Sequence, residues 1–371
     1  MNTRSIRHIV RRLREPIRRT LAGLGIDARP GTLVLVTGGG EWAVKQIAVA
    51  LREQLTSWYA DVQILDLLVQ RPYLAQANVH CLCRPAFFAG SGIPALHRSN
   101  RIVVSWLHGA KSSENPEMRA ACRQLEKHWQ VVRRFIVPNS VTQRGVLECG
   151  VDPDRLHVIP NGVDTHKFRA ASDDSERLAC RRALGVPDTA FVVGSFQRDE
   201  DDAGLPKLVK GPDILREAVS RAHGRVPIHL LLAGPSREYV RRQLDARGIP
   251  YTYQRAESAT DLLRFYHSID AYLISSREEG GPATLRESLA SGVPVVSTRV
   301  GLAVDLVEHG VNGLLADIDD TDALAQNLLA LFLDPGLRRR LIGEGRRAIE
   351  ALDFSVIAKR YQEEVYRLAF V

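Results

Sequence analysis

Short apolar segments alternate along this chain with longer stretches whose apolar residues recur at helical spacing. The apolar segments are residues 33–36, 62–68, 102–105, 135–137, 190–193, 228–232, 271–274 and 293–297. The stretches with helical spacing include residues 42–55, 212–222, 238–246, 261–267 and 282–291. Parallel strands joined by helical crossovers produce this alternation, so the sequence predicts an α/β protein.

The length of 371 residues indicates two domains, at roughly 150 residues each. The alternation restarts after a polar, charged segment at 165–187, which we interpret as an interdomain linker. We therefore expect one domain over 31–165 and a second over 185–353. The last stretch, 354–371, is predicted to be an amphipathic helix that packs back on the first domain.

Residues 1–30 form a basic, amphipathic extension. They hold eight arginines and two acidic residues, and therefore nearly all of the net charge of +7. Apolar residues recur in it at helical steps: Ile6, Val10, Leu13, Ile17, Leu21 and Leu24. Two interpretations remain open: a helix lying on an anionic membrane surface, or a helix packed on its own domain with solvated arginines.

The composition indicates an intracellular protein. No run of 18 or more apolar residues exists, and the N-terminus lacks the apolar region of a secretory signal. Five cysteines, an odd number, give no disulfide framework. We expect a cytoplasmic location, with peripheral attachment to the inner membrane surface as the open alternative.

The segment 275–298, SSREEGGPATLRESLASGVPVVST, carries the strongest functional signal. A strand ends near its start, and glycines and a helix follow. A helix that begins there leaves the amides of Ala283 and Thr284 without partners inside the helix, which suits a phosphate. Gly281 lets a ligand approach the backbone closely.

Two glutamates lie on either side of this helix start. Glu287 follows on the helix among small residues, where its carboxylate is suited to accept hydrogen bonds from sugar hydroxyls. Glu279 lies in the preceding loop. Taken singly, Glu287 is interpreted as a structural ion-pair residue and Glu279 as a solvated charge. Their joint placement around the helix start favours a ligand site.

These motifs resemble the family-4 retaining glycosyltransferases, also called glycosyl transferases group 1. The two glutamates stand in EGGPATLRE, and SGVPVVST follows at 291–298. VIPNGVD at 158–164 and HGVNGLL at 309–315 also match family motifs, in the family's order. The resemblance implies the GT-B fold, in which two Rossmann-like doubly wound domains face a central cleft.

The resemblance also implies the reaction and the residues that carry it. A hexose would pass from a nucleotide-diphosphate sugar to an acceptor hydroxyl, with retention, in synthesis of a surface polysaccharide or glycolipid. Glu279 would contact the donor sugar, Glu287 the ribose, and Arg198 with Lys210 the diphosphate. His108, in a His-Gly pair after a strand, would lie beside the donor sugar. The family commonly has an aromatic residue and a glycine where this chain has Gly281 and a proline, so sugar contacts there differ.

The basic loop that contains Arg198 and Lys210 can also be interpreted in other ways. Lys207 competes with Arg198 for its role, and Arg198 and Lys210 can both belong to a solvated basic loop. The acidic run at 199–202 contains Asp-x-Asp, which we interpret as solvated charge rather than as a metal site. Arg198, Lys210 and helix amides would neutralise the diphosphate. We therefore expect no metal or other cofactor, and the nucleotide sugar acts as co-substrate.

A glycine-rich turn follows the first strand. Gly39 and Gly40 belong to a Gly-x-Gly-x-x-Ala pattern, with Asp66 near the end of the next strand. This weak dinucleotide fingerprint supports a rival, an NAD-dependent enzyme, but it also suits the loop that lines the cleft of the resembled family. Other rivals are a sugar-nucleotide epimerase or hydrolase and a catalytically silent binding scaffold. The expected partners are a nucleotide sugar and a glycan or glycolipid acceptor, without nucleic acid.

Overall fold

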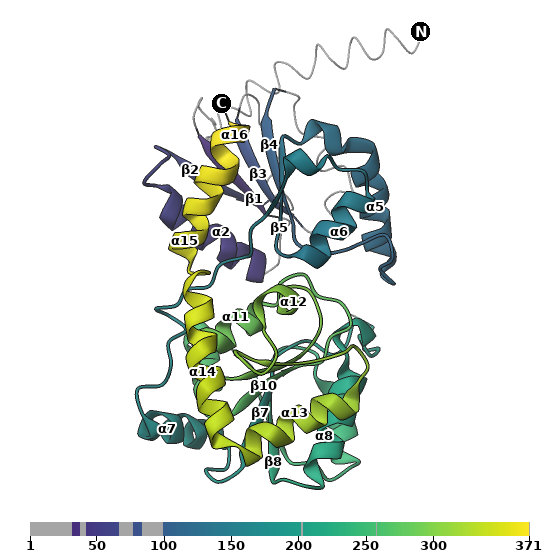
Figure 1. Ribbon diagram of the computed structural model, residues 1–371, viewed down its shortest axis with the longest axis vertical. Helices are drawn as coiled ribbons and strands as arrows, with labels where there is room; N and C mark the ends of the chain where they lie inside the picture. The colour runs from purple at the N-terminus through teal and green to yellow at the C-terminus, as the bar shows by residue number, and fades with distance from the viewer. Residues whose placement is uncertain are drawn as a thin grey trace. The chain divides into compact units, whose positions relative to one another are not determined.

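The computed structural model describes residues 32–37, 42–66, 77–83, 99–201, 203–256 and 258–370. The basic extension at 1–30 and the glycines at 39 and 40 lie outside these residues. The chain divides into two compact units (Figure 1). The first consists of Met1–Val137, Arg144–Ile159 and Ala358–Val371, and the second of Pro138–Gln143 and Pro160–Ile357.

The first unit is built on a parallel sheet with the strand order β2-β1-β3-β4-β5-β6. Its strands are β1 (Leu33–Thr37), β2 (Val62–Asp66), β3 (Asn78–Cys83), β4 (Arg101–Trp106), β5 (Arg134–Val137) and β6 (Leu156–Val158). Its helices are α2 (Trp42–Leu55) and α5 (Pro116–His128), together with α6 (Ser140–Glu148) from Arg144 onward. The strand order reverses at β1, which pairs with both β2 and β3. This is a doubly wound sheet.

From Ala358 onward, the C-terminal helical segment belongs to the first unit. It runs through α15 (Phe354–Arg360), the π-helical turn η4 (Tyr361–Tyr366) and α16 (Arg367–Ala369). His80 on β3 bonds through Nδ1 to the Tyr366 hydroxyl at 2.6 Å and through Nε2 to Ser105 Oγ at 2.8 Å. Burial lowers the pKa of His80 to about 3, so its ring is neutral. Arg133 also donates to the Ala369 carbonyl at 2.8 Å.

The second unit has a parallel sheet in the order β12-β11-β10-β7-β8-β9. Its strands are β7 (Phe191–Ser195), β8 (Ile228–Ala233), β9 (Tyr251–Gln254), β10 (Ala271–Ile274), β11 (Val295–Thr298) and β12 (Leu314–Ala316). Counted within the unit, this is the Rossmann order 3-2-1-4-5-6, reversed at the pair β7 and β10. Ligands of such sheets bind at the carboxyl ends of the strands where the order reverses.

Helices cover both unit cores. In the second unit they are α7 (Asp174–Leu184), α8 (Pro212–His223), α9 (Glu238–Asp245), α10 (Ala259–Ser268), α11 (Ala283–Ala290), α12 (Ala303–Leu306), α13 (Thr321–Leu333) and α14 (Pro335–Glu350). α8 and α13 pack side by side (Figure 1). Their buried residues, such as Leu215 and Leu328, join the core with β7 and β8. None of the helices in the described residues is long and apolar enough to span a membrane.

The polar segment at 165–187 was predicted to be an interdomain linker, and the structure shows that it is not one. It lies within the second unit and contains α7. Arg177 and Arg181 both pair with Asp270, at 2.8 and 2.6 Å. The charges of this segment therefore hold the helix against the unit, and the local sequence does not show the partner because it lies 93 and 89 residues away from the two arginines.

Candidate functional site

Two loops meet at the carboxyl ends of β7 and β10, where the strand order reverses. Gln197, in the loop after β7, donates from Nε2 to the Lys210 carbonyl at 2.6 Å and to Ser275 Oγ at 3.1 Å. Ser276, in the loop after β10, donates to Gln197 Oε1 at 3.4 Å. Sequence reasoning missed Gln197 and both serines. Their position directly after two strands was the available signal, but it needed the strand order to be informative.

Lys210 and Glu279, both predicted site residues, form an ion pair at this edge. Lys210 Nζ lies 2.7 Å from Glu279 Oε1, which also accepts from Ser276 Oγ at 2.9 Å. The lysine side chain is 27% exposed, so its ammonium remains within reach of a ligand. Gly211 follows with φ +60°, and a Cβ there would lie 1.8 Å from the Ser275 carbonyl oxygen. Glycine is required for this close approach.

The backbone of the loop that carries Glu279 is held from its other side. The Gly280 carbonyl accepts from the Leu302 amide at 2.9 Å and from Asn139 Nδ2. Gly301, with φ +47°, packs so closely that a Cβ would lie 2.2 Å from the Gly280 oxygen. These contacts fix the loop through its backbone and leave the Glu279 side chain to face Lys210.

The start of α11 lies directly after this loop. Its N-cap, Pro282, has extended ψ and makes no side-chain capping bond, so the helix begins at Ala283. The first amides, those of Ala283 and Thr284, have no acceptor inside the helix. Gly281 and these residues are half-buried. The arrangement provides amide donors and the positive end of a helix dipole for an anion.

Glu287 lies one turn further along α11 and is buried, with 8% of its surface exposed. Its Oε2 accepts from the Tyr266 hydroxyl at 2.8 Å, a contact that sequence reasoning missed. Burial raises the pKa of Glu287, and the Tyr266 hydrogen bond opposes this shift. The Tyr266 ring packs against the Phe196 ring, with 5.1 Å between their centroids. Tyr266 therefore contacts both the loop after β7 and the Glu287 carboxylate.

The other predicted site residues are placed as follows. Arg198 lies half-buried in the loop after β7, at the same sheet edge as Lys210. His108 is half-buried two residues beyond β4 and belongs to the first unit. Gly39 and Gly40 lie outside the described residues. The second unit thus brings Lys210, Glu279 and the start of α11 together.

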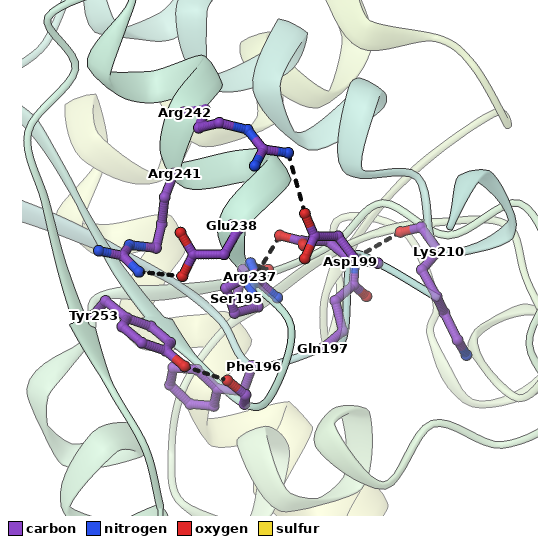
Figure 2. Close-up of polar contacts among 12 residues, drawn as sticks. Ser195, Phe196, Gln197, Asp199, Lys210, Arg237, Glu238, Arg241, Arg242 and Tyr253 are labelled. Carbon is purple, nitrogen blue, oxygen red and sulfur yellow. Dashed lines mark hydrogen bonds and ion pairs between the residues drawn. The ribbon is translucent and has the colours of Figure 1, made fainter. Parts of the chain in front are cut away.

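The acidic run at 199–202 was expected to be solvated, and this is wrong for its first two residues. Asp199 is 1% exposed, and its Oδ2 lies 3.2 Å from Arg237 Nε (Figure 2). Glu200 is 6% exposed and pairs with Arg242 at 3.3 Å. Burial raises the pKa of Asp199 to about 6 despite the attraction of Arg237. The basic partners lie about 40 residues later, which is why the local sequence did not reveal them.

Among the residues that the structure describes, no group of three or more histidine, cysteine, aspartate or glutamate side chains is placed to hold a metal ion. The groups present at the β7 and β10 edge are an ammonium, a guanidinium, helix amides and carboxylates. Such a set binds a phosphate-containing ligand that also carries hydroxyl groups.

Two family models match the chain. The model of glycosyl transferases group 1 matches residues 203–334, and that of glycosyltransferase family 4 matches residues 64–167. The first includes Lys210, Glu279 and Glu287, and the second includes His108. Both matches confirm the resemblance drawn from the motifs: the chain is similar to these glycosyltransferase families over the two matched regions.

Curated relatives include D-inositol 3-phosphate glycosyltransferases. The chain is 33% identical over 209 residues to that of Xylanimonas cellulosilytica, covering 54% of this chain and 48% of the relative. It is 26% identical over 370 residues to that of Rhodococcus jostii, covering 93% of this chain and 77% of the relative. The chain thus spans about half the length of the first of these relatives.

Solved structures show the same fold. Anabaena HepE in complex with UDP-glucose matches with a TM-score of 0.70 and 19% identity, over 91% of this chain and 99% of that one. Sucrose-phosphate synthase from Thermosynechococcus elongatus matches with a TM-score of 0.73 and 16% identity, over the same shares. The expected GT-B fold, with two Rossmann-like units, is confirmed.

Proposed function

We propose that this protein transfers a hexose from a nucleotide-diphosphate sugar to an acceptor hydroxyl. The observation that carries the proposal is the Lys210–Glu279 pair beside the start of α11, at the strand reversal of a Rossmann sheet. A cation, free helix amides and a carboxylate are placed where such sheets bind nucleotides. HepE, whose fold is similar, is known in complex with UDP-glucose, which supports this class of donor.

Each group has a role in the proposed donor complex. Lys210 and Arg198 hold the diphosphate, one as a point charge and the other by its planar fork. The amides of Ala283 and Thr284 contribute further donors to it. The Glu287 carboxylate accepts one hydrogen bond from Tyr266 and can accept further hydrogen bonds from the ribose hydroxyls. Glu279 accepts hydrogen bonds from the hydroxyls of the sugar.

The chemical step follows from these roles. As the bond between the anomeric carbon and the phosphate oxygen lengthens, negative charge grows on the diphosphate, where Lys210 and Arg198 already stand. The acceptor hydroxyl attacks the same face that the diphosphate leaves, and its proton passes to the departing phosphate oxygen. The new glycosidic bond forms as the old one breaks, so the configuration is retained. His108 contributes to the sugar side of the site in this proposal.

The proposed acceptor is a glycan or glycolipid, in synthesis of a surface polysaccharide or glycolipid. The arginine-rich sequence at 1–30 supports a lipid-anchored acceptor, because each basic residue near an anionic membrane contributes about 1 kcal/mol. Co-sedimentation with anionic vesicles tests this part. We expect the full chain to bind at low salt and a chain starting at Pro30 to lose that binding; equal binding by both would contradict it.

The donor assignment is tested by incubating the protein with labelled UDP-, GDP- and ADP-sugars, with and without a lipid extract. Transfer of label to an acceptor supports a transferase. Release of free sugar without acceptor dependence would instead show a hydrolase, and conversion of one sugar to another an epimerase. Inositol 3-phosphate serves as a comparison acceptor, since relatives are named for it.

A further inference from the structure

The loop after β7, residues 196–198, is fastened at both ends by one arginine. We call these residues the strap. Arg237 Nη2 donates to Ser195 Oγ at 3.1 Å, where the strap begins. Its Nε lies 3.2 Å from Asp199 Oδ2, where the strap ends (Figure 2). The Asp199 amide also donates to the Ser236 carbonyl at 3.2 Å.

The strap is connected to Lys210 by two routes of hydrogen bonds. One runs from the Gln197 side chain, inside the strap, to the Lys210 carbonyl at 2.6 Å. The other starts at the Asp199 carbonyl, which accepts from the Lys207 amide at 2.8 Å. The Lys207 carbonyl in turn accepts from the Lys210 amide at 2.8 Å. A shift of Asp199 therefore reaches Lys210 through both routes.

Stability alone does not explain why the charged side chains of Arg237 and Asp199 are buried at this position. The side chains of Arg237 and Asp199 are 0% and 1% exposed, so both ions are withdrawn from water. Apolar residues of similar volume often stabilise a protein as well as such a buried pair. Among the described residues, Arg237 Nη1 and Nε and both Asp199 carboxylate oxygens are buried without a hydrogen-bond partner, so the contact between the two side chains is an ion pair. Arg237 instead provides one hydrogen bond, to Ser195, and one ion pair, to Asp199, from a single planar group, which an apolar side chain does not offer.

We infer that Arg237 and Asp199 are positioning residues, which hold the strap so that Arg198 and Lys210 face the diphosphate of the donor. The inference rests on the proposed function and adds two residues that do not touch the donor themselves. Small displacements of charged groups at such a site strongly weaken their interaction with a bound phosphate. Loss of the pair is therefore expected to affect donor binding more than it affects folding.

The test uses the full chain and whichever of UDP-glucose, GDP-mannose and ADP-glucose the unaltered protein binds most tightly. Arg237→Met and the isosteric Asp199→Asn each remove the pair. We expect either change to weaken binding in calorimetry by about tenfold or more. Amide hydrogen exchange at Lys207 and Lys210 should accelerate in both variants, while exchange in the β8 core stays unchanged.

Two further variants separate positioning from general stability. Leu244→Ala removes a fully buried side chain from α9, the helix that follows Arg237, and this side chain packs in the hydrophobic core of the second unit. It should lower the melting temperature and leave donor affinity unchanged. Arg237→Lys keeps the charge but lacks the fork that reaches both Ser195 and Asp199, so it should bind with intermediate affinity.

The inference is overturned if Arg237→Met and Asp199→Asn bind the donor as the unaltered protein does. It is also overturned if Leu244→Ala weakens binding as much as Arg237→Met at an equal loss of melting temperature. If the unaltered protein binds none of the three nucleotide sugars, the proposed function fails first and this inference with it. Tight binding by the unaltered protein and by both pair variants rejects the inference alone.

Discussion

Lys210 Nζ and Glu279 Oε1 lie 2.7 Å apart although 69 residues separate them in sequence. The pair joins the segment that precedes α8 to the loop that follows β10, and it stands beside the first amides of α11. A donor diphosphate placed there meets a cation that is already oriented. Preorganised charge of this kind is worth more at the transition state than charge that must be gathered during the reaction.

The first prediction separates Lys210 from its neighbour Lys207. Lys210→Ala should weaken nucleotide-sugar binding by roughly 10- to 100-fold, as the loss of a charge-assisted hydrogen bond does. Lys207→Ala should have a much smaller effect, because the ion pair at the strand edge is the one between Lys210 and Glu279. Calorimetry with both variants decides the matter. A larger loss from Lys207→Ala would assign the diphosphate to the other lysine.

The second prediction concerns the ribose. Glu287→Gln replaces a carboxylate that accepts from Tyr266 by an amide of the same shape. We expect about tenfold weaker binding of the ribose donor, from one lost hydrogen bond to a charged group. The same variant should lose its preference for the ribose donor over its deoxyribose analogue. A preference that persists in Glu287→Gln would place the ribose elsewhere.

Two of the helices predicted from periodic patterns agree closely with the structure, whereas α5, α13 and α14 were not predicted. The helix at 42–55 has the predicted bounds, and α8 differs by one residue. The strands β6, β9 and β12 were not predicted, since each has only three or four residues and too short an apolar pattern. Short strands of this kind are fixed by pairing with a neighbour rather than by their own sequence.

The site residues that were predicted and those that were missed differ in how far apart their contacts lie in the sequence. Glu279, Glu287 and the helix start were found because they lie within one continuous segment, 275–298. Asp199 was misjudged because the buried Arg237 is supplied by another strand's loop. Tyr266 and Gln197 were missed for the same reason, since each contact joins segments brought together only by the sheet order. Local sequence patterns carry no information on such pairs.

The third prediction is a pH dependence of donor affinity. Burial raises the pKa of Asp199 to about 6, and the charged groups that face it are Arg237, Glu200 and Glu238. As pH falls through about 6, Asp199 takes up a proton and Arg237 loses its counter-charge. Donor affinity should therefore fall in this range. Titration of Asp199→Asn, which has no proton to gain, should give a flatter profile.

The sign of the stability change distinguishes this effect from acid unfolding. A carboxyl whose folded-state pKa is raised contributes stability at low pH and loses it as pH rises through about 6. Protonation of Asp199 therefore favours the folded state while it weakens donor binding. Calorimetric affinity and melting temperature should move in opposite directions relative to Asp199→Asn. Parallel loss of both would contradict the assignment.

The fourth prediction concerns divalent cations. Turnover should persist in excess chelator, because Lys210, Arg198 and the start of α11 neutralise the departing diphosphate. The assay compares initial rates before and after chelation, and again after magnesium or manganese is restored. A rate that disappears with chelator and returns with either cation would show that this set of charges is insufficient.

The most direct measurement is turnover with a panel of labelled nucleotide sugars and a lipid extract, using the unaltered protein and Lys210→Ala in parallel. The account predicts that one donor transfers its label to an extractable acceptor with the anomeric configuration retained. It also predicts that Lys210→Ala, folded and with an unchanged melting profile, abolishes most of this transfer. Label transfer at an equal rate by both proteins, or no transfer from any donor, would contradict it.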